Sequence, residues 1–183
     1  MKCAPVADKL DWWQLDWNDF EAQVLAGSFQ RMAVHYQLQL EDLPPALQKH
    51  WRGHVAEAKD ADALKEEQHL LEGERQAWRS ERLTLAEKWL AAYMESGVGR
   101  PWSLQLEREE LEGLLMVLND RRLILALEHG IDETLMEVDF DDIKEVPLRQ
   151  ALWEVHVLAL FQEQCLAALT LASNPETKKD DTL

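Results

Sequence analysis

The chain of 183 residues has few of the residues that interrupt helices, with only six prolines and seven glycines. Leu, Ala, Glu and Gln, which favour helix, are common. The length suits one domain with its own core and is short for two. We therefore predict an all-α fold, an irregular helical bundle of about four main helices. It would form a single domain over residues 1–172, followed by a disordered tail over 173–183.

Cysteines are equally scarce. Cys3 and Cys165 lie near opposite ends of the sequence and form neither a disulfide framework nor a Cys-x-x-Cys pair. The apolar runs are far shorter than the ~20 residues that span a bilayer, and the first residues lack the apolar stretch of a secretory signal. We expect a cytoplasmic protein with reduced thiols that does not associate with membranes.

Basic residues are few, because 19 Lys and Arg stand against 35 Asp and Glu, giving a formal net charge of −16. Nucleic acids and anionic lipids bind positive surface, so we expect neither as a partner. Tryptophan is the abundant exception, with eight residues. Most of these should fill the core or a dimer contact, and the alternative is an aromatic contact surface for a partner protein.

The strongest helical pattern covers residues 107–131. Leu111, Leu114, Leu118 and Leu125 recur there at the three- and four-residue spacing of one helix face. Acidic residues crowd the start, where a helix favours negative charge, and Gly130 suits a left-handed stop at the end. This pattern predicts a central helix.

A polar stretch, residues 119–122, interrupts that apolar helix. Asn119 and Arg122 are three residues apart and share one helix face, and a buried guanidinium needs a partner such as Asp120, Glu154 or Glu163. We predict that Asn119, Asp120, Arg122 and Glu163 form a polar lock that fixes the packing of the central and last helices. The alternative is a recognition site for a carboxylate or for the terminus of a partner.

Other segments complete the predicted bundle. Asp16 or Asn18 caps a first helix that ends before the proline pair at 44–45, and Pro147 opens the last helix. One long helix covers about 55–95. It is either a surface helix laid over the core or a dimer arm whose Arg75 and Arg82 meet acids of a partner. Residues 102–106 alternate and suit one short extended segment.

Candidate catalytic and metal-binding patterns are weak. His50, His54 and Glu57 have the i, i+4, i+7 spacing that can hold zinc or iron on one helix face, although Gly53 weakens that helix. Glu66-x-x-His69 is half of a di-iron motif whose second half is missing. We expect no cofactor and no catalytic residue. A metal-dependent enzyme using His50, His54 and Glu57 remains an alternative.

Two stretches resemble a bacterial family. Leu118-Asn119-Asp120-Arg121-Arg122-Leu123, followed by Gly130, is similar to the Leu-Asn-Asp-x-Arg-Leu hallmark of the domain-of-unknown-function family numbered two thousand and seventeen. Phe161-Gln162-Glu163 with Leu166 resembles a Leu-Gln-Glu-x-Leu element near the C-terminus of that family. Together these stretches cover about the last third of the chain.

The resemblance implies an all-α cytoplasmic protein without established enzymatic activity, often encoded beside the adaptor of the Clp protease. One branch of the family is interpreted as redox-responsive regulators that depend on a close cysteine pair, and Cys3 and Cys165 depart from that spacing. We predict a non-enzymatic adaptor or regulator that forms a homodimer, binds a protein partner and is linked to regulated proteolysis. The alternative is a transcription-associated regulator that acts through protein contacts.

Overall fold

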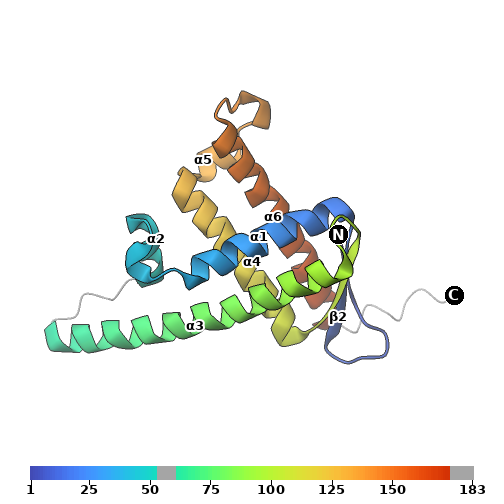
Figure 1. Ribbon diagram of the computed structural model, residues 1–183, viewed down its shortest axis with the longest axis horizontal. Coiled ribbons are helices and arrows are strands. Elements are labelled where there is room, and N and C mark those ends of the chain that lie inside the picture. The colour runs from blue at the N-terminus through green and yellow to red at the C-terminus, as the bar shows by residue number, and fades with distance from the viewer. Residues whose placement is uncertain (53–60, 174–183) are drawn as a thin grey trace.

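The computed structural model describes the backbone of residues 1–52 and 61–173, and the side chains of 1–52 and 69–170. Most of this part consists of four long helices, α1 (Asp19–Gln37), α3 (Ala61–Ser96), α4 (Arg108–His129) and α6 (Val146–Ser173). Short elements connect them, namely η1 (Leu40–Asp42), α2 (Pro45–Arg52), α5 (Glu133–Met136) and η2 (Phe140–Asp142). Helix α1 packs on α3, and α4 packs on α6 (Figure 1). None of the described helices is long and apolar enough to cross a membrane.

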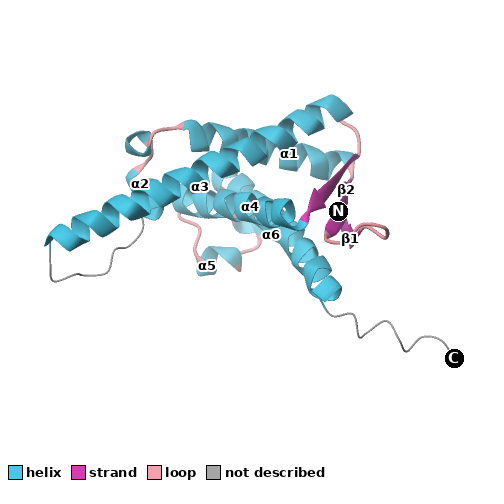
Figure 2. Cartoon of the chain, turned by 90° about the horizontal axis from the view of Figure 1, so that it is seen from below, coloured by secondary structure: helices cyan, strands magenta, loops and turns pink. Residues whose placement is uncertain are grey.

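The described part of the chain is mostly helical, as predicted, but a small three-stranded antiparallel sheet makes the fold α+β rather than purely all-α (Figure 2). The strand order in this sheet is β1-β2-β3. The strands are β1 (Lys2–Pro5), β2 (Trp12–Trp17) and β3 (Trp102–Glu107), and β3 confirms the extended segment expected at 102–106. In β2, Trp13, Leu15 and Trp17 are buried at alternate positions, as expected for a strand with one face on the core. Trp17 stacks on Trp102 of β3 with ring centroids 5.0 Å apart.

The ends of the helices follow local capping chemistry. Asn18 caps α1, since its side chain accepts from the Glu21 backbone N–H at 2.9 Å and the Glu21 carboxylate accepts from the Asn18 N–H at 3.0 Å. Helix α4 ends at Gly130, whose φ of 62° lies in the left-handed region that favours glycine. Pro147 occupies the first turn of α6, as predicted. Of the predicted tail, only Ser173 belongs to the described residues, as the last residue of α6.

Helix α3 contains the predicted long helix from Ala61 onward, and residues 55–60 lie outside the described part. The residues on the inner face of α3 change from charged to apolar along the helix. Ala86, Trp89 and Tyr93 are buried in the core, whereas the same face one to three turns earlier carries arginines. The arginine-bearing half extends past α1 beside α2, toward the left of Figure 1. Helix α3 therefore contacts its neighbours through polar groups in its N-terminal half and through apolar groups in its C-terminal half.

Candidate functional site: buried carboxylates and the α4 groove

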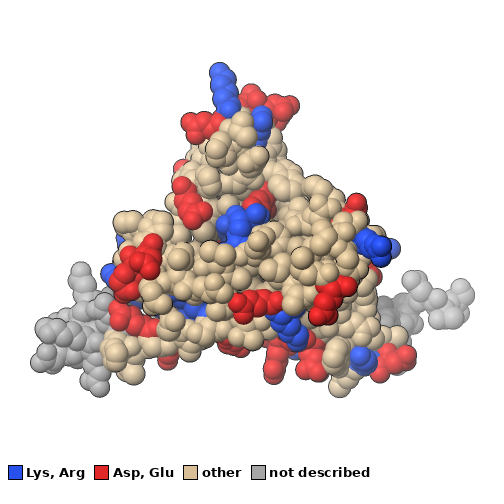
Figure 3. Space-filling model, viewed as in Figure 1, with Lys and Arg blue, Asp and Glu red and all other residues tan. Residues whose placement is uncertain are grey.

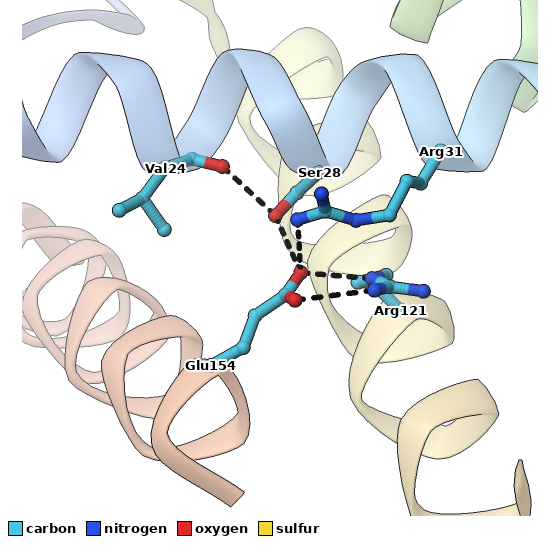
Figure 4. A network of polar contacts seen from close by, with 5 residues as sticks. All are labelled: Val24, Ser28, Arg31, Arg121 and Glu154. Atoms are coloured by element: carbon cyan, nitrogen blue, oxygen red, sulfur yellow. Dashed lines mark hydrogen bonds and ion pairs between the residues drawn. The ribbon is translucent and has the colours of Figure 1, made fainter. Parts of the chain in front are cut away.

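The first buried carboxylate is Glu154 on α6, which joins three helices (Figure 4). Arg121 of α4 donates Nε to Oε1 at 2.8 Å and Nη2 to Oε2 at 3.1 Å, the two-pronged geometry that a guanidinium favours. Arg31 and Ser28 of α1 donate to the same Oε1 at 2.9 and 3.0 Å. Burial raises the pKa of Glu154, but the hydrogen bonds and charges of Arg121 and then Arg31 outweigh it and the net shift is downward.

The second buried carboxylate is Asp120 on α4. It accepts from Arg82 Nη1 of α3 and from the Tyr36 hydroxyl of α1, both at 2.6 Å. Burial raises the pKa of Asp120, despite these two donors, and burial together with the charge of Asp120 raises the pKa of Tyr36. Asp120 thus clamps α1 and α3 to α4, one residue away from the Arg121 contact with α6.

Two more arginines of α3 cap the C-terminal ends of neighbouring helices. Arg79 donates to the backbone carbonyls of His35 at 3.0 Å and Leu38 at 2.7 Å, at the end of α1. Arg75 donates to the backbone carbonyls of His50 at 2.9 Å and Trp51 at 2.8 Å, at the end of α2. Carbonyls in the last turn of a helix lack intrahelical donors and carry partial negative charge, so cations stabilise them.

Beneath these arginines lies a buried histidine. Trp51 Nε1 donates to His35 Nε2 at 2.9 Å. Burial, followed by the charge of Arg79, lowers the pKa of His35 to about 4. Arg75 and Arg82, the two arginines that the dimer-arm prediction assigns to acids of a partner, bind groups of their own chain.

The four residues predicted as a polar lock occupy different environments. Asp120 is buried in the contacts above, and Arg122 is half-buried, donating Nη1 to Gln162 Oε1 of α6 at 2.6 Å. Asn119 and Glu163 are exposed, and in the described part of the chain their side chains form no hydrogen bond or ion pair. The structure therefore joins α4 to α6 through Arg122 and Gln162 and does not bring Glu163 to Arg122.

Arg121 and Glu154 carry the main ionic contact between α4 and α6, yet sequence reasoning assigned Arg121 no role. The signal was present, because Leu114, Leu118, Arg121 and Leu125 continue a single helical stripe in which Arg121 replaces an apolar residue. The polar lock predicted from sequence depends instead on the i, i+3 spacing of Asn119 and Arg122.

The metal candidates lie mostly outside the described residues. His50 is half-buried at the end of α2, whereas His54 and Glu57 fall in the segment 53–60. Within the residues described, no group of three His, Cys, Asp or Glu side chains is placed to hold a metal ion.

The cysteines are brought together although 161 residues separate them. Strand β1 packs on α6, and the Cys165 thiol hydrogen-bonds to Cys3. That hydrogen bond lowers the pKa of Cys3 against the effect of burial, whereas the same contact and burial raise the pKa of Cys165. The large separation of the two residues in sequence thus does not keep them apart in the fold.

Helix α4 lies between α3 and α6 (Figure 2), and a groove lined by residues of all three helices follows its exposed side. Two cavities of about 430 and 480 Å³ form it, and they share Arg82, Glu112 and Met116. Trp78 of α3 lines one cavity and Leu166 of α6 lines the other. We call this surface the α4 groove. The predicted residues Asn119 and Asp120 lie on its wall.

Comparisons of the chain with protein-family models, curated proteins and solved structures found no match. The α4 groove and the two buried carboxylates are therefore interpreted from their own geometry.

Proposed function

We propose that this protein is a non-enzymatic helical interaction protein, an adaptor or regulator, and that it contacts its partner through the α4 groove. The observation that carries the proposal is the exposure of large apolar side chains along that groove. Trp78 and Met116 are each 48% exposed and Leu166 is 53% exposed. Apolar side chains that gather in a concave surface, rather than lying singly, are typical of binding sites for other proteins.

The buried polar groups support the same proposal. Glu154 and Asp120 are occupied by arginines and hydroxyl groups of the chain itself, so their role is to hold the four helices in fixed positions. A rigid wall of helices is what a binding groove requires. On the face shown in Figure 3, basic side chains occur singly among acidic ones, which favours a protein partner over nucleic acid.

A more specific part of the proposal is a link to regulated proteolysis. It rests on the resemblance of the stretches 118–123 and 161–166 to the bacterial family described above. Residues of both stretches lie on the groove, with Asn119 and Asp120 on α4 and Gln162 and Leu166 on α6. Of these residues, Asn119 and Leu166 are exposed, which supports a role in partner binding, whereas Asp120 and Gln162 are buried and position the helices around the groove.

The test is crosslinking in an extract of the cells that produce the protein, followed by mass spectrometry. We expect Met116→Asp and Leu166→Asp to lose the partners that the wild-type protein captures, because a charge would be buried in the contact. Met94→Asp and Leu160→Asp are matched controls, since Met94 is 59% and Leu160 56% exposed outside the groove. Equal capture by all four variants would place the binding surface elsewhere, and no capture by the wild-type protein would contradict the proposal.

A further inference from the structure

The shape of the α4 groove is elongated. From Glu109 to Asn119 it follows α4 for about 15 Å, or roughly three turns at 1.5 Å per residue. Trp78, Met116 and Leu166 come from three helices and are distributed around it. An extended groove with spaced apolar contacts fits the apolar face of an amphipathic helix, a recurring mode of peptide recognition.

The charge of the groove is negative. Glu81 and Glu109 form no ion pair in the described part of the chain, and Glu112 pairs with Arg108 only in an exposed contact at 3.0 Å. Among the described residues that line the groove, Arg82 is the single cation, and Asp120 neutralises it. The groove therefore presents carboxylates that lack a counter-charge, which attract a basic partner.

Local helix chemistry accounts for only one of the two unpaired acids. Glu109 lies in the first turn of α4, where the helix dipole favours negative charge. Glu109 also has Glu112 three residues away, a repulsive spacing. Glu81 lies in the middle of α3, where the helix ends have little influence. Neither acid forms an ion pair in the described part of the chain, so both are available to pair with a basic residue of a partner.

A second copy of the chain is a poor occupant. Each copy carries a formal charge of −16, and a symmetric contact through the groove would oppose Glu81 and Glu109 with the same acids of the other copy. A helix of a different protein that carries positive charge avoids this repulsion.

Building on the proposed function, we propose that the α4 groove binds an amphipathic helix of another protein that carries Lys or Arg on both sides of a short apolar stripe. The apolar residues of that helix contact Met116 and Leu166. Its basic residues approach Glu81 on the α3 side and Glu109 at the start of α4. Charge thereby fixes where the helix lies, and the apolar contacts supply most of the affinity.

The experiment measures binding of two blocked, labelled peptides of about 14 residues by fluorescence anisotropy. Both carry leucines spaced three and four residues apart on an alanine background. One has lysines beside the leucine stripe and the other has glutamates there. We expect the lysine peptide to bind the wild-type protein at least about tenfold more tightly than the glutamate peptide. Glu81→Lys/Glu109→Lys should reverse that preference.

Glu95→Lys/Asp141→Lys is the matched control, because it changes the net charge equally at exposed positions outside the groove. It should keep the wild-type preference, and urea unfolding should show that each variant is folded. Equal binding of both peptides, no binding of either, or equal losses in both double variants would overturn the inference. If the peptide experiment fails but crosslinking still captures partners that depend on Met116 and Leu166, the proposed function stands and only the inference of a basic helix is overturned. Dimerisation that Met116→Asp abolishes would instead identify a second copy as the occupant.

Discussion

His35 is a buried base whose partner requires it to be neutral. Its Nε2 accepts from Trp51, and its pKa of about 4 lies below the value near 6.5 of an unfolded histidine. Between these values the unfolded chain binds more protons than the folded one. The stabilisation from neutral His35 is therefore fully present above pH 6.5 and is lost as the pH falls toward 4.

We predict that the wild-type protein loses about 1 kcal/mol more stability between about pH 7 and pH 5 than His35→Gln does. Glutamine keeps an acceptor for Trp51 but does not titrate in this range. Urea unfolding of both proteins at the two pH values measures the difference. Parallel losses would show that His35 is not the group that senses acid.

Cys3 and Cys165 are expected to differ in reactivity because the hydrogen bond between them favours the thiolate of Cys3 alone. We predict that iodoacetamide labels Cys3 in the folded protein at neutral pH and labels Cys165 only after unfolding. Cys165→Ala should slow the labelling of Cys3 several-fold at neutral pH, by removing the donor. Mass spectrometry of timed samples follows each site, and Cys3→Ser should show no labelling of the folded protein. Equal native labelling of both thiols would contradict the buried contact.

At the scale of elements, two contacts of different kinds join α4 to α6. Arg121 and Glu154 form a buried pair between α4 and α6, whereas Arg122 and Gln162 form a half-buried contact with a neutral partner. Removing one member of a buried ion pair leaves the other charge without compensation, a loss larger than that of a single neutral hydrogen bond.

We predict that Arg121→Met lowers the free energy of unfolding by about 3 kcal/mol or more, and Arg122→Met by about 1 kcal/mol. Arg121→Met/Glu154→Leu should cost less than the sum of its single changes, because it leaves no unpaired member. Denaturant unfolding of the four variants gives these differences. A larger loss of stability for Arg122→Met than for Arg121→Met would show that Arg122, the arginine that the sequence indicated, makes the more important contact.

The elements themselves were largely predictable from sequence, since α4, its stop at Gly130 and the opening of α6 near Pro147 follow from periodicity and local chemistry. Strand β2 was not predicted, because Asp16 and Asn18 are both residues that cap helices and they lie beside the alternating Trp13, Leu15 and Trp17. The strand ends at Trp17, directly before the Asn18 cap of α1, and it is held by pairing with β1 on one side and with β3 on the other.

The partners of the buried charges were less predictable. Arg79 and Arg82 could be placed on one face of α3 by spacing, but their acceptors come from α1 and α4. The acceptors of Arg79 are backbone carbonyls, which leave no trace in sequence. Side-chain periodicity thus indicates which residues face inward, whereas the groups that they meet depend on how the helices cross.

At the scale of the whole molecule, the surface charge opposes folding. A formal charge of −16 destabilises the compact state by self-repulsion, and Glu81 and Glu109 add to it without an ion pair in the described part of the chain. At 0.1 M salt, interactions between exposed charges more than about 10 Å apart are largely screened, whereas buried pairs such as Arg121–Glu154 are screened much less. Added sodium chloride should therefore stabilise the protein.

We predict that Glu81→Gln/Glu109→Gln is more stable than the wild-type protein by about 0.5 kcal/mol at low salt, and that the difference disappears near 0.5 M salt. Thermal unfolding at both salt concentrations measures it, with Glu95→Gln/Asp141→Asn as a control of equal charge. If the groove variant gains more than the control, the groove holds its acids at a cost to stability, as expected for residues that serve a partner. A loss of stability at low salt would show that Glu81 and Glu109 support the fold itself, and the argument for a basic partner helix would lose its electrostatic basis.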